Sequence, residues 1–377
     1  MKLVYLDNAA TTKMSKRVIE EMIESFENIY GNPSSTHTLG QKAKAVVENA
    51  RHIVAKNLKV EAKEIVFTSG GAEGNNLVIK GFLKQNKDKG KHIITTKIEH
   101  STVLKTFESL EKQGYDVTYI DVTKDGIIDV EKLKKAVRKD TALVSVMFVN
   151  NETGVIQPIK EIGEFLKEKE IFFHTDAVQA IGKFEIYPKE LRIDALTVSS
   201  HKFYGPKGTG FVFIDKKYNI EKEIFGGSQE RNRRAGTENV NGILGTGVAL
   251  EEVYEKMEVI FEHEKKIQEY LEEKLKNEIG RIQKVEINGE NSRRVKNITN
   301  VFIENTDIQM LLVALDMRGI CVSGGSACMS GSLENSYVLK AMGLNDEKLK
   351  SSFRISIGKD TTIEEIDYFI ENLKEII

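Results

Sequence analysis

The sequence contains no tryptophan, four prolines and only two cysteines, Cys321 and Cys328. Two thiols cannot build the disulfide framework of a small secreted domain, and this pair lacks the Cys-x-x-Cys spacing of a zinc site. The seven histidines add no cluster with the spacing of metal ligands. We therefore expect neither a disulfide scaffold nor a metal centre.

An excess of charge of one sign is also missing, since 55 Lys and Arg residues face 57 Asp and Glu residues. A protein without a basic surplus is not expected to contact nucleic acid directly. No apolar run approaches the length that spans a membrane, and the first residues lack the long apolar stretch of a secretory signal. These absences predict a cytoplasmic protein that does not bind membranes.

Short β-branched and aromatic runs alternate with amphipathic stretches such as residues 39–58. Near-continuous apolar strands separated by helices predict an α/β fold with a mainly parallel sheet covered on both faces. Ligands of such sheets bind beyond the carboxyl ends of the strands. The seven expected strands are residues 65–68, 92–95, 117–120, 143–149, 171–173, 196–198 and 211–214.

The chain of 377 residues is long enough for a large domain and a smaller one. Apolar residues at helical spacing predict one long helix over residues 242–280, with a charged and solvated outer face, for which a partner-binding surface is the alternative. We expect this helix to link a large domain of residues 15–258 to a smaller α+β domain. The smaller domain would comprise residues 1–14 and 259–377.

Two reactive side chains, the amine of Lys202 and the carboxylate of Asp176, lie at the ends of expected strands. Lys202 lies in a turn rich in Gly and Pro, where a lysine shielded from water can form an imine with an aldehyde. Asp176 ends another apolar run, and a carboxylate there can keep a pyridine nitrogen protonated. Together they are what pyridoxal phosphate requires of a protein. The alternative for Lys202 is a surface lysine in a turn, and the alternative for Asp176 is an N-cap of the next helix.

Three further segments end strands with polar residues. The glycine-rich junction at residues 68–76 opens a helix, whose free N–H groups and dipole favour an anion, although such turns are common without a ligand. His100 can stack on a cofactor or move a proton, and a structural histidine is the alternative. Asn151 can place its amide near a ligand, and turn formation is the alternative.

The C-terminal part supplies a thiol and an arginine. Cys328 lies among small polar residues, which predicts an exposed and mobile nucleophile, whereas Cys321 lies in an apolar run. Arg354 stands on an apolar strand and needs an anion, for which a substrate carboxylate gives the bidentate match. Snorkelling to the surface is the alternative for this arginine.

With these residues in place, the chain resembles the cysteine desulfurases of the class V aminotransferase family. The small-residue segment around Cys328 is similar to that of the long-loop branch, with a mobile loop of about residues 321–336. The matches cover nearly the whole chain and keep their order. They are residues 5–12, 31–37, 69–76, 99–100, 150–152, 176–179, 199–208, 234–239, 325–328 and 352–355.

The resemblance implies a fold-type I homodimer that binds pyridoxal 5'-phosphate in the large domain. Lys202 would link to the cofactor and act as the base, His100 would stack on the ring, and Asp176 would contact the ring nitrogen. The family usually has Thr where Ala72 stands, which predicts weaker cofactor retention. The other implied cofactor contacts are Gln179 and Asn151 at the ring and Gly71, Ala72, Ser199, His201 and the second subunit's Thr237 at the phosphate. The implied substrate contacts are Asn32, Asn151 and Arg354.

The implied activity converts L-cysteine to L-alanine and leaves the sulfur as a persulfide on Cys328. The acceptor would be an iron–sulfur scaffold protein or a tRNA-thiolation enzyme, and no residue chooses between them. A selenocysteine lyase or another class V aminotransferase-type enzyme is the nearest alternative, although an aminotransferase would not need Cys328. A non-enzymatic assembly protein is disfavoured by the retained Lys, Asp, His and Arg set.

Overall fold

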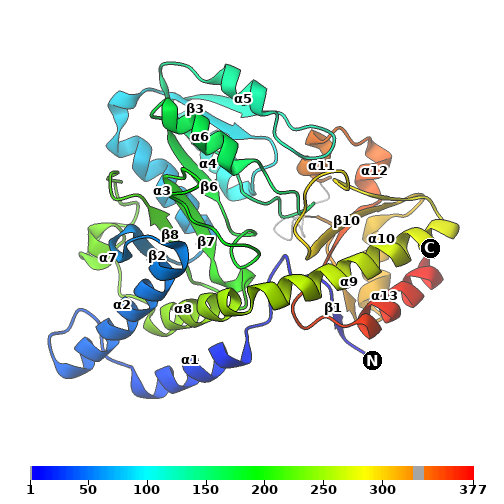
Figure 1. The fold of residues 1–377 in the computed structure, drawn as a ribbon, viewed down its shortest axis with the longest axis horizontal. Helices are drawn as coiled ribbons and strands as arrows, with labels where there is room; N and C mark the ends of the chain where they lie inside the picture. The colour runs from blue at the N-terminus through cyan, green and yellow to red at the C-terminus, as the bar shows by residue number, and fades with distance from the viewer. Residues whose placement is uncertain (1, 326–334) are drawn as a thin grey trace.

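The computed structural model describes residues 2–325 and 335–377. Figure 1 shows a larger lobe built around one sheet and a smaller lobe beside it, with helices α8 (Val240–Glu255) and α9 (Met257–Asn277) running along both. We call these the large lobe, which holds β2 to β8, and the small lobe, which holds β1 and β9 to β12. No helix within the described residues is both long and apolar enough to cross a membrane.

The large-lobe sheet has seven strands in the order β2-β8-β7-β6-β5-β3-β4. Strand β8 pairs antiparallel with β2 and β7, and every other neighbouring pair is parallel. The predicted α/β class and all seven expected strands are confirmed. The strands are β2 (Ile65–Thr68), β3 (His92–Thr96), β4 (Asp116–Ile120), β5 (Thr141–Ser145), β6 (Phe172–Asp176), β7 (Ala195–Ser199) and β8 (Gly210–Ile214).

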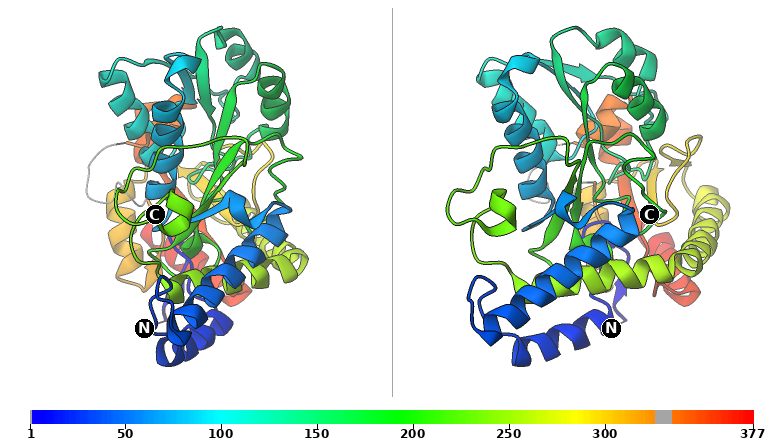
Figure 2. Two further views of the ribbon diagram at one scale, coloured as in Figure 1. Left: turned by 90° about the vertical axis from the view of Figure 1, so that its left-hand side faces the viewer. Right: turned by 60° about the vertical axis from the view of Figure 1, so that its left-hand side comes forward.

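Helices cover both faces of this sheet. Alternate side chains point to opposite faces, so Phe172 packs with α3 and α4 while Phe173 packs with α2, α6 and α8. Figure 2 shows α1, α2 and α8 lying together on one side. The helices are α1 (Lys16–Asn28), α2 (Thr38–Leu58), α3 (Gly71–Gln85), α4 (Ser101–Lys112), α5 (Val130–Ala136), α6 (Ile159–Glu168), α7 (Gln229–Asn232) and α8 (Val240–Glu255).

The small lobe has its own core. Strands β12 (Ser352–Ser356), β10 (Ile298–Ile303) and β9 (Val285–Ile287) form an antiparallel sheet. Strand β1 (Val4–Tyr5) pairs with β11 (Ile320–Cys321), so the N-terminal segment joins the C-terminal core. The exact domain boundaries stay a prediction. The helices are α9 (Met257–Asn277), α10 (Ile308–Asp316), α11 (Tyr337–Ala341), α12 (Asp346–Lys350) and α13 (Ile363–Ile376).

The prediction of one long helix over residues 242–280 is wrong. Two helices, α8 and α9, meet at Lys256, whose φ of -108° and ψ of 11° break the helical path. Helix α8 buries its side chains in the large-lobe core, whereas α9 buries Ile267, Leu271 and Leu275 in the small-lobe core. The break lets each helix turn its apolar face toward a different core.

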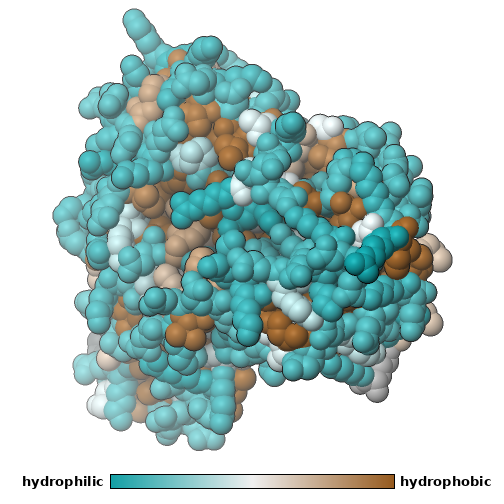
Figure 3. Space-filling model, turned by 45° about the vertical axis from the view of Figure 1, so that its right-hand side comes forward, coloured by the Kyte–Doolittle hydropathy of each residue, from teal (hydrophilic) through white to brown (hydrophobic). Residues whose placement is uncertain are grey.

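The surface carries few large apolar patches on the face shown in Figure 3, where hydrophobic residues lie in separate groups among hydrophilic ones. One larger group is an apolar stripe that runs along α1 and continues past its last residue, Asn28, to Tyr30. Ile19, Ile23, Phe26 and Tyr30 follow one another at helical spacing and are 38%, 54%, 60% and 72% exposed. A monomer seldom leaves such a stripe uncovered.

Candidate active site

A cavity of about 520 Å³ lies beyond the carboxyl ends of β2, β3, β6 and β7. This is the position that a mainly parallel sheet predicts for a ligand. The sheet topology brings these strand ends to one edge, because β6 and β7 are neighbours, while β2 lies beyond β8 on one side and β3 lies beyond β5 on the other. Ten sequence-predicted residues line the cavity: Gly71, Ala72, His100, Asn151, Asp176, Gln179, Ser199, His201, Lys202 and Arg354.

Three predicted residues are not part of this described lining. Asn32 is exposed, and its Oδ1 accepts a hydrogen bond from the Ser34 N–H at 2.9 Å. Thr237 is exposed on the loop before α8. Cys328 lies outside the described residues. The roles assigned to these three residues stay predictions.

Lys202 ends a short 3-10 helix, Ser200–Lys202, that follows β7 directly. Its Nζ donates to the carbonyl oxygens of Ala9 at 2.5 Å and Ala10 at 2.8 Å. The Gln179 side chain donates to the same Ala9 carbonyl at 2.8 Å. The amine is therefore held at the cavity wall by the N-terminal segment, and the alternative of an ordinary surface lysine is wrong.

Asp176 is buried at the end of β6 with two neutral donors. Its Oδ2 accepts from Nδ2 of Asn75 at 2.8 Å, and its Oδ1 accepts from the Val178 N–H at 3.0 Å. No described basic side chain forms an ion pair with it. A buried carboxylate without a counter-ion is costly, so the site fits a ligand that brings a cation, such as a pyridinium.

An anion cradle lies at the start of α3. Gly70 has a φ of 139°, and a Cβ there would lie 3.2 Å from the Ser199 Oγ, so glycine allows the close approach of the two segments. No described side chain caps the first N–H groups of this helix. Those groups and the Ser199 hydroxyl suit a phosphate. Together with Lys202 and Asp176, the cradle gives a donor set that fits pyridoxal phosphate.

Two titratable residues that line the cavity have shifted pKa values. Burial raises the pKa of Glu73, but Arg234 at 2.9 Å and the Ser69 N–H outweigh it, so the pKa is lowered overall. Burial, and then Lys202 and Lys207, lower the pKa of His201 to about 4. His201 is therefore neutral near pH 7 and can accept or donate a hydrogen bond beside the cradle.

His100 is the N-cap of α4. Its Nδ1 accepts from the Thr102 backbone N–H at 3.3 Å and lies 2.9 Å from Thr102 Oγ1. His100 therefore has the structural role of a hydrogen-bonded N-cap that was the alternative for this residue. The ring also lines the cavity, so the cap holds it in a defined position beside a ligand.

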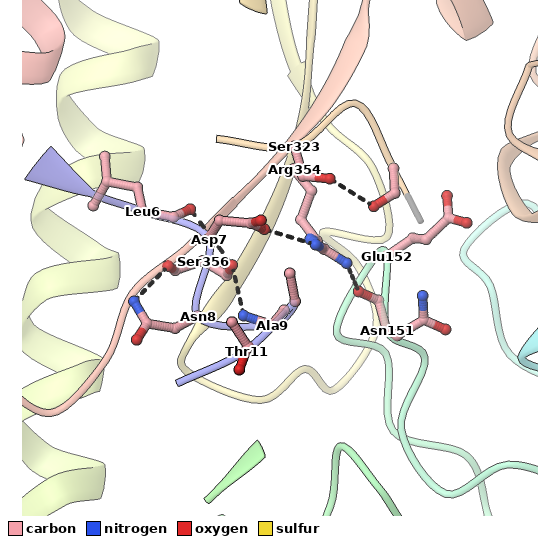
Figure 4. A network of polar contacts seen from close by, with 12 residues as sticks. Leu6, Asp7, Asn8, Ala9, Thr11, Asn151, Glu152, Ser323, Arg354 and Ser356 are labelled. Carbon is pink, nitrogen blue, oxygen red and sulfur yellow. Dashed lines mark hydrogen bonds and ion pairs between the residues drawn. The ribbon is translucent and has the colours of Figure 1, made fainter. Parts of the chain in front are cut away.

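Arg354 is 1% exposed on β12, which excludes snorkelling. The anion beside it is Asp7, whose Oδ1 lies 2.8 Å from Nη2, and the Asn151 carbonyl accepts from Nη1 at 2.7 Å (Figure 4). Its buried Nε has no described partner, and neither has Asn151 Oδ1. Sequence reasoning missed Asp7, although this residue lies in the matched segment 5–12.

Two buried glutamates were also missed. Burial raises the pKa of Glu99 to about 8, despite hydrogen bonds from Met147 and Thr96. Burial also raises the pKa of Glu152, which Ser336, Arg354 and His100 oppose. Both residues stand next to predicted site residues in the sequence, and that adjacency was the available signal.

No group of three or more His, Cys, Asp and Glu residues in the described ranges could hold a metal ion. The cavity instead combines an amine, a carboxylate without a described counter-ion, an anion cradle and a paired arginine. Such a set can bind a phosphorylated pyridine aldehyde and an amino acid side by side.

Comparisons with known proteins identify the relatives of this chain. The family model described as Aminotransferase class-V matches residues 4–369. The chain is 48% identical over 378 residues to "Cysteine desulfurase IscS" from Clostridium botulinum (strain Hall), covering 100% of this chain and 94% of that protein.

The chain is also similar over most of its length to solved structures. A "NIFS-LIKE PROTEIN" superposes with a TM-score of 0.93 at 38% identity, covering 100% of this chain and 99% of the other. A structure titled "SspA in complex with cysteine" superposes with a TM-score of 0.84 at 35% identity, covering 95% of this chain and 100% of the other.

Proposed function

This chain belongs to the aminotransferase class-V family and is a cysteine desulfurase, and we propose that it binds pyridoxal phosphate in the cavity beyond β6 and β7. The observation that carries the proposal is Asp176, a buried carboxylate whose described donors are both neutral, in the same cavity as the Lys202 amine. The substrate is L-cysteine, and the sulfur passes on to an acceptor.

We assign the cofactor contacts from the donors present. Lys202 would hold the aldehyde carbon, Asp176 the ring nitrogen, and His100 the ring face. Bound pyridoxal phosphate supplies an electron sink for the pairs left on the substrate when bonds break at Cα and Cβ. The remaining contacts in this proposal are Gln179 and Asn151 at the ring and Gly71, Ala72, Ser199 and His201 at the phosphate.

Substrate binding and proton transfer are assigned to four side chains. Arg354, with Asn151 and Asn32, would hold the carboxylate of L-cysteine and thereby orient its Cα–H bond. The Lys202 amine would remove the proton from Cα.

The sulfur-transfer step is assigned to Cys328. Its thiolate would attack the substrate sulfur, so that an S–S bond forms while the Cβ–S bond breaks. The electron pair of the broken bond stays with carbon, which takes up a proton and becomes the methyl group of L-alanine. Carbon is reduced and sulfur is oxidised in the same step, so no external oxidant is needed.

The oligomeric state is proposed from the apolar stripe on α1. A second copy of the chain would cover Ile19, Ile23, Phe26 and Tyr30, and we propose a homodimer. In that dimer Thr237 would reach the phosphate of the neighbouring subunit, which fits its exposure outside the cavity of its own chain.

The acceptor and the location remain proposals. We propose that the persulfide passes to a scaffold protein for iron–sulfur cluster assembly or to a tRNA-thiolation enzyme. The cytoplasmic location stays a prediction.

The decisive experiment replaces one cysteine at a time. Cys328→Ser should lower L-alanine formation at least about a thousand-fold, because a hydroxyl does not take up sulfane sulfur, while the cofactor absorption band remains. Cys321→Ser is the matched control, because Cys321 lies on β11 outside the cavity lining, and it should retain activity. Undiminished turnover by Cys328→Ser would refute the role.

A second arm separates the nearest alternative. The wild-type protein is given L-cysteine or L-selenocysteine, and L-alanine is measured. A desulfurase turns over L-cysteine and carries an alkylatable persulfide on Cys328, which mass spectrometry detects. Turnover of L-selenocysteine alone would identify a selenocysteine lyase.

A further inference from the structure

Asn75 is a fully buried residue of α3 that touches two other parts of the site. Its Nδ2 donates one hydrogen bond to Asp176 Oδ2 at 2.8 Å and one to Thr102 Oγ1 at 2.9 Å. The orientation of the amide is set by chemistry, because the opposite orientation would place its oxygen against the Asp176 carboxylate. Its own Oδ1 is buried without a described partner.

Thr102 continues this connection to His100. The Thr102 backbone N–H donates to His100 Nδ1 at 3.3 Å, and the Thr102 hydroxyl lies 2.9 Å from the same nitrogen. Because an N–H donor points at Nδ1, this nitrogen presents a lone pair, and the hydroxyl can donate to it as well. The hydroxyl oxygen still accepts from Asn75. In the neutral ring the proton is therefore on Nε2.

We propose that Asn75 and Thr102 are positioning residues that brace Asp176 and His100 against each other and select the Nε2–H tautomer of His100. The proposal rests on the proposed function, in which Asp176 and His100 contact the same cofactor ring. The link is a brace and not a proton wire, since Asn75 donates at both of its contacts. Its effect is to hold the carboxylate at the ring edge and the imidazole at the ring face in one geometry.

The first test measures the tautomer directly. Side-chain ¹⁵N NMR of the histidine-labelled holoenzyme, with the His100 signals assigned by their loss in His100→Gln, should show Nδ1 without a proton and Nε2 with one. Thr102→Val keeps the backbone N–H but loses the hydroxyl donor at Nδ1, so it should move these signals toward a tautomer mixture, and Thr102→Ser should restore the wild-type pattern. A proton on Nδ1 in the wild-type protein would overturn the proposal.

The second test measures coupling across the brace. Asn75→Ala should raise the dissociation constant of pyridoxal phosphate about ten-fold, because Asp176 loses a donor, and should shift the His100 signals although Asn75 does not touch the ring. The double variant Asn75→Ala/Thr102→Val should lose less affinity than the two single losses combined. Fully additive losses, or unchanged His100 signals in Asn75→Ala, would sink the idea.

Control variants distinguish the proposed positioning effect of Asn75 and Thr102 from a loss of folding and from a loss of activity. Asn76→Ala removes the neighbouring amide, which donates to the Ala72 carbonyl, and should leave the His100 signals and cofactor affinity unchanged. Should Asn75→Ala fail to fold, the Thr102→Val and Thr102→Ser pair decides the matter, since Thr102 is only half-buried. The tautomer is read without turnover, so a failed desulfurase assignment would leave this result standing.

Discussion

The two walls of the cavity are built in different ways. The large-lobe wall carries Asp176, Ser199 and Lys202, each at or just after the end of a strand in one sheet. A second wall contains Asn151 and Arg354, and Arg354 is paired with Asp7 behind it, so that three separate segments meet; Asp7 and Arg354 are 347 residues apart in the chain. A wall made of strand ends is encoded locally, whereas a wall made of distant segments depends on how the lobes pack.

The walls also differ in electrostatics. Asp176 has no described counter-ion, while the Arg354 guanidinium is already paired with Asp7. The first wall is therefore completed by a cationic ligand, and the second is neutralised within the chain.

The largest expected effect comes from breaking the neutralised wall. Asp7→Asn should lower the free energy of unfolding by about 3 kcal/mol, because it leaves the buried Arg354 charge without a partner. The double variant Asp7→Asn/Arg354→Gln should recover part of that loss. Urea unfolding of the cofactor-free protein measures both.

The other wall supplies the control for this prediction. Asp176→Asn removes a carboxylate that has no described ion pair and should cost less stability than Asp7→Asn in the cofactor-free protein. Equal losses from the two variants would mean that the walls do not differ as described.

An intermediate effect concerns Glu99, the buried carboxyl beside His100. Its native pKa of about 8 lies above the ordinary value of 4.5, so between these pH values the unfolded chain has lost a proton that the native protein retains. As the pH rises from about 4.5 to about 8, the free energy of unfolding should therefore fall by up to about 1.4 kcal/mol per pH unit, and it should level off above pH 8.

Glu99→Gln should remove this slope, because the amide stays neutral and its oxygen can still accept from Met147 and Thr96. Between pH 6 and pH 8, the wild-type protein should lose about 2 kcal/mol more than the variant in urea unfolding. Glu371→Gln, at an exposed position of α13, should keep the wild-type slope. Identical slopes for Glu99→Gln and wild type would contradict the raised pKa.

The smallest expected effect concerns the affinity of the large-lobe wall for the phosphate of the cofactor. Ala72→Thr adds a hydroxyl at the start of α3 and should lower the dissociation constant of pyridoxal phosphate by about three-fold, since one more donor reaches the anion. Ala72→Val has the same shape without the hydroxyl and should give no gain. Absorbance titration of the cofactor-free protein distinguishes them, and equal affinities for all three proteins would show that the hydroxyl contributes nothing.

Several features were predictable because their signals are local. The seven strands are short and rich in apolar residues; Asp176 ends one of them, and Lys202 and His100 come three and four residues after the last residue of two others. The long helix was mispredicted because its apolar pattern is continuous across Lys256, and only the two cores reveal that α8 and α9 face different neighbours.

The amino-acid order alone thus determined the α/β class, the strand ends and the residue types that meet a cofactor, because backbone preference and side-chain alternation act over a few neighbouring residues. Tertiary structure alone decided that Asp7 neutralises Arg354 and that Asn75 and Thr102 join Asp176 to His100. Such pairings depend on the relative placement of whole helices and strands, and that placement is settled only when the cores of both lobes pack.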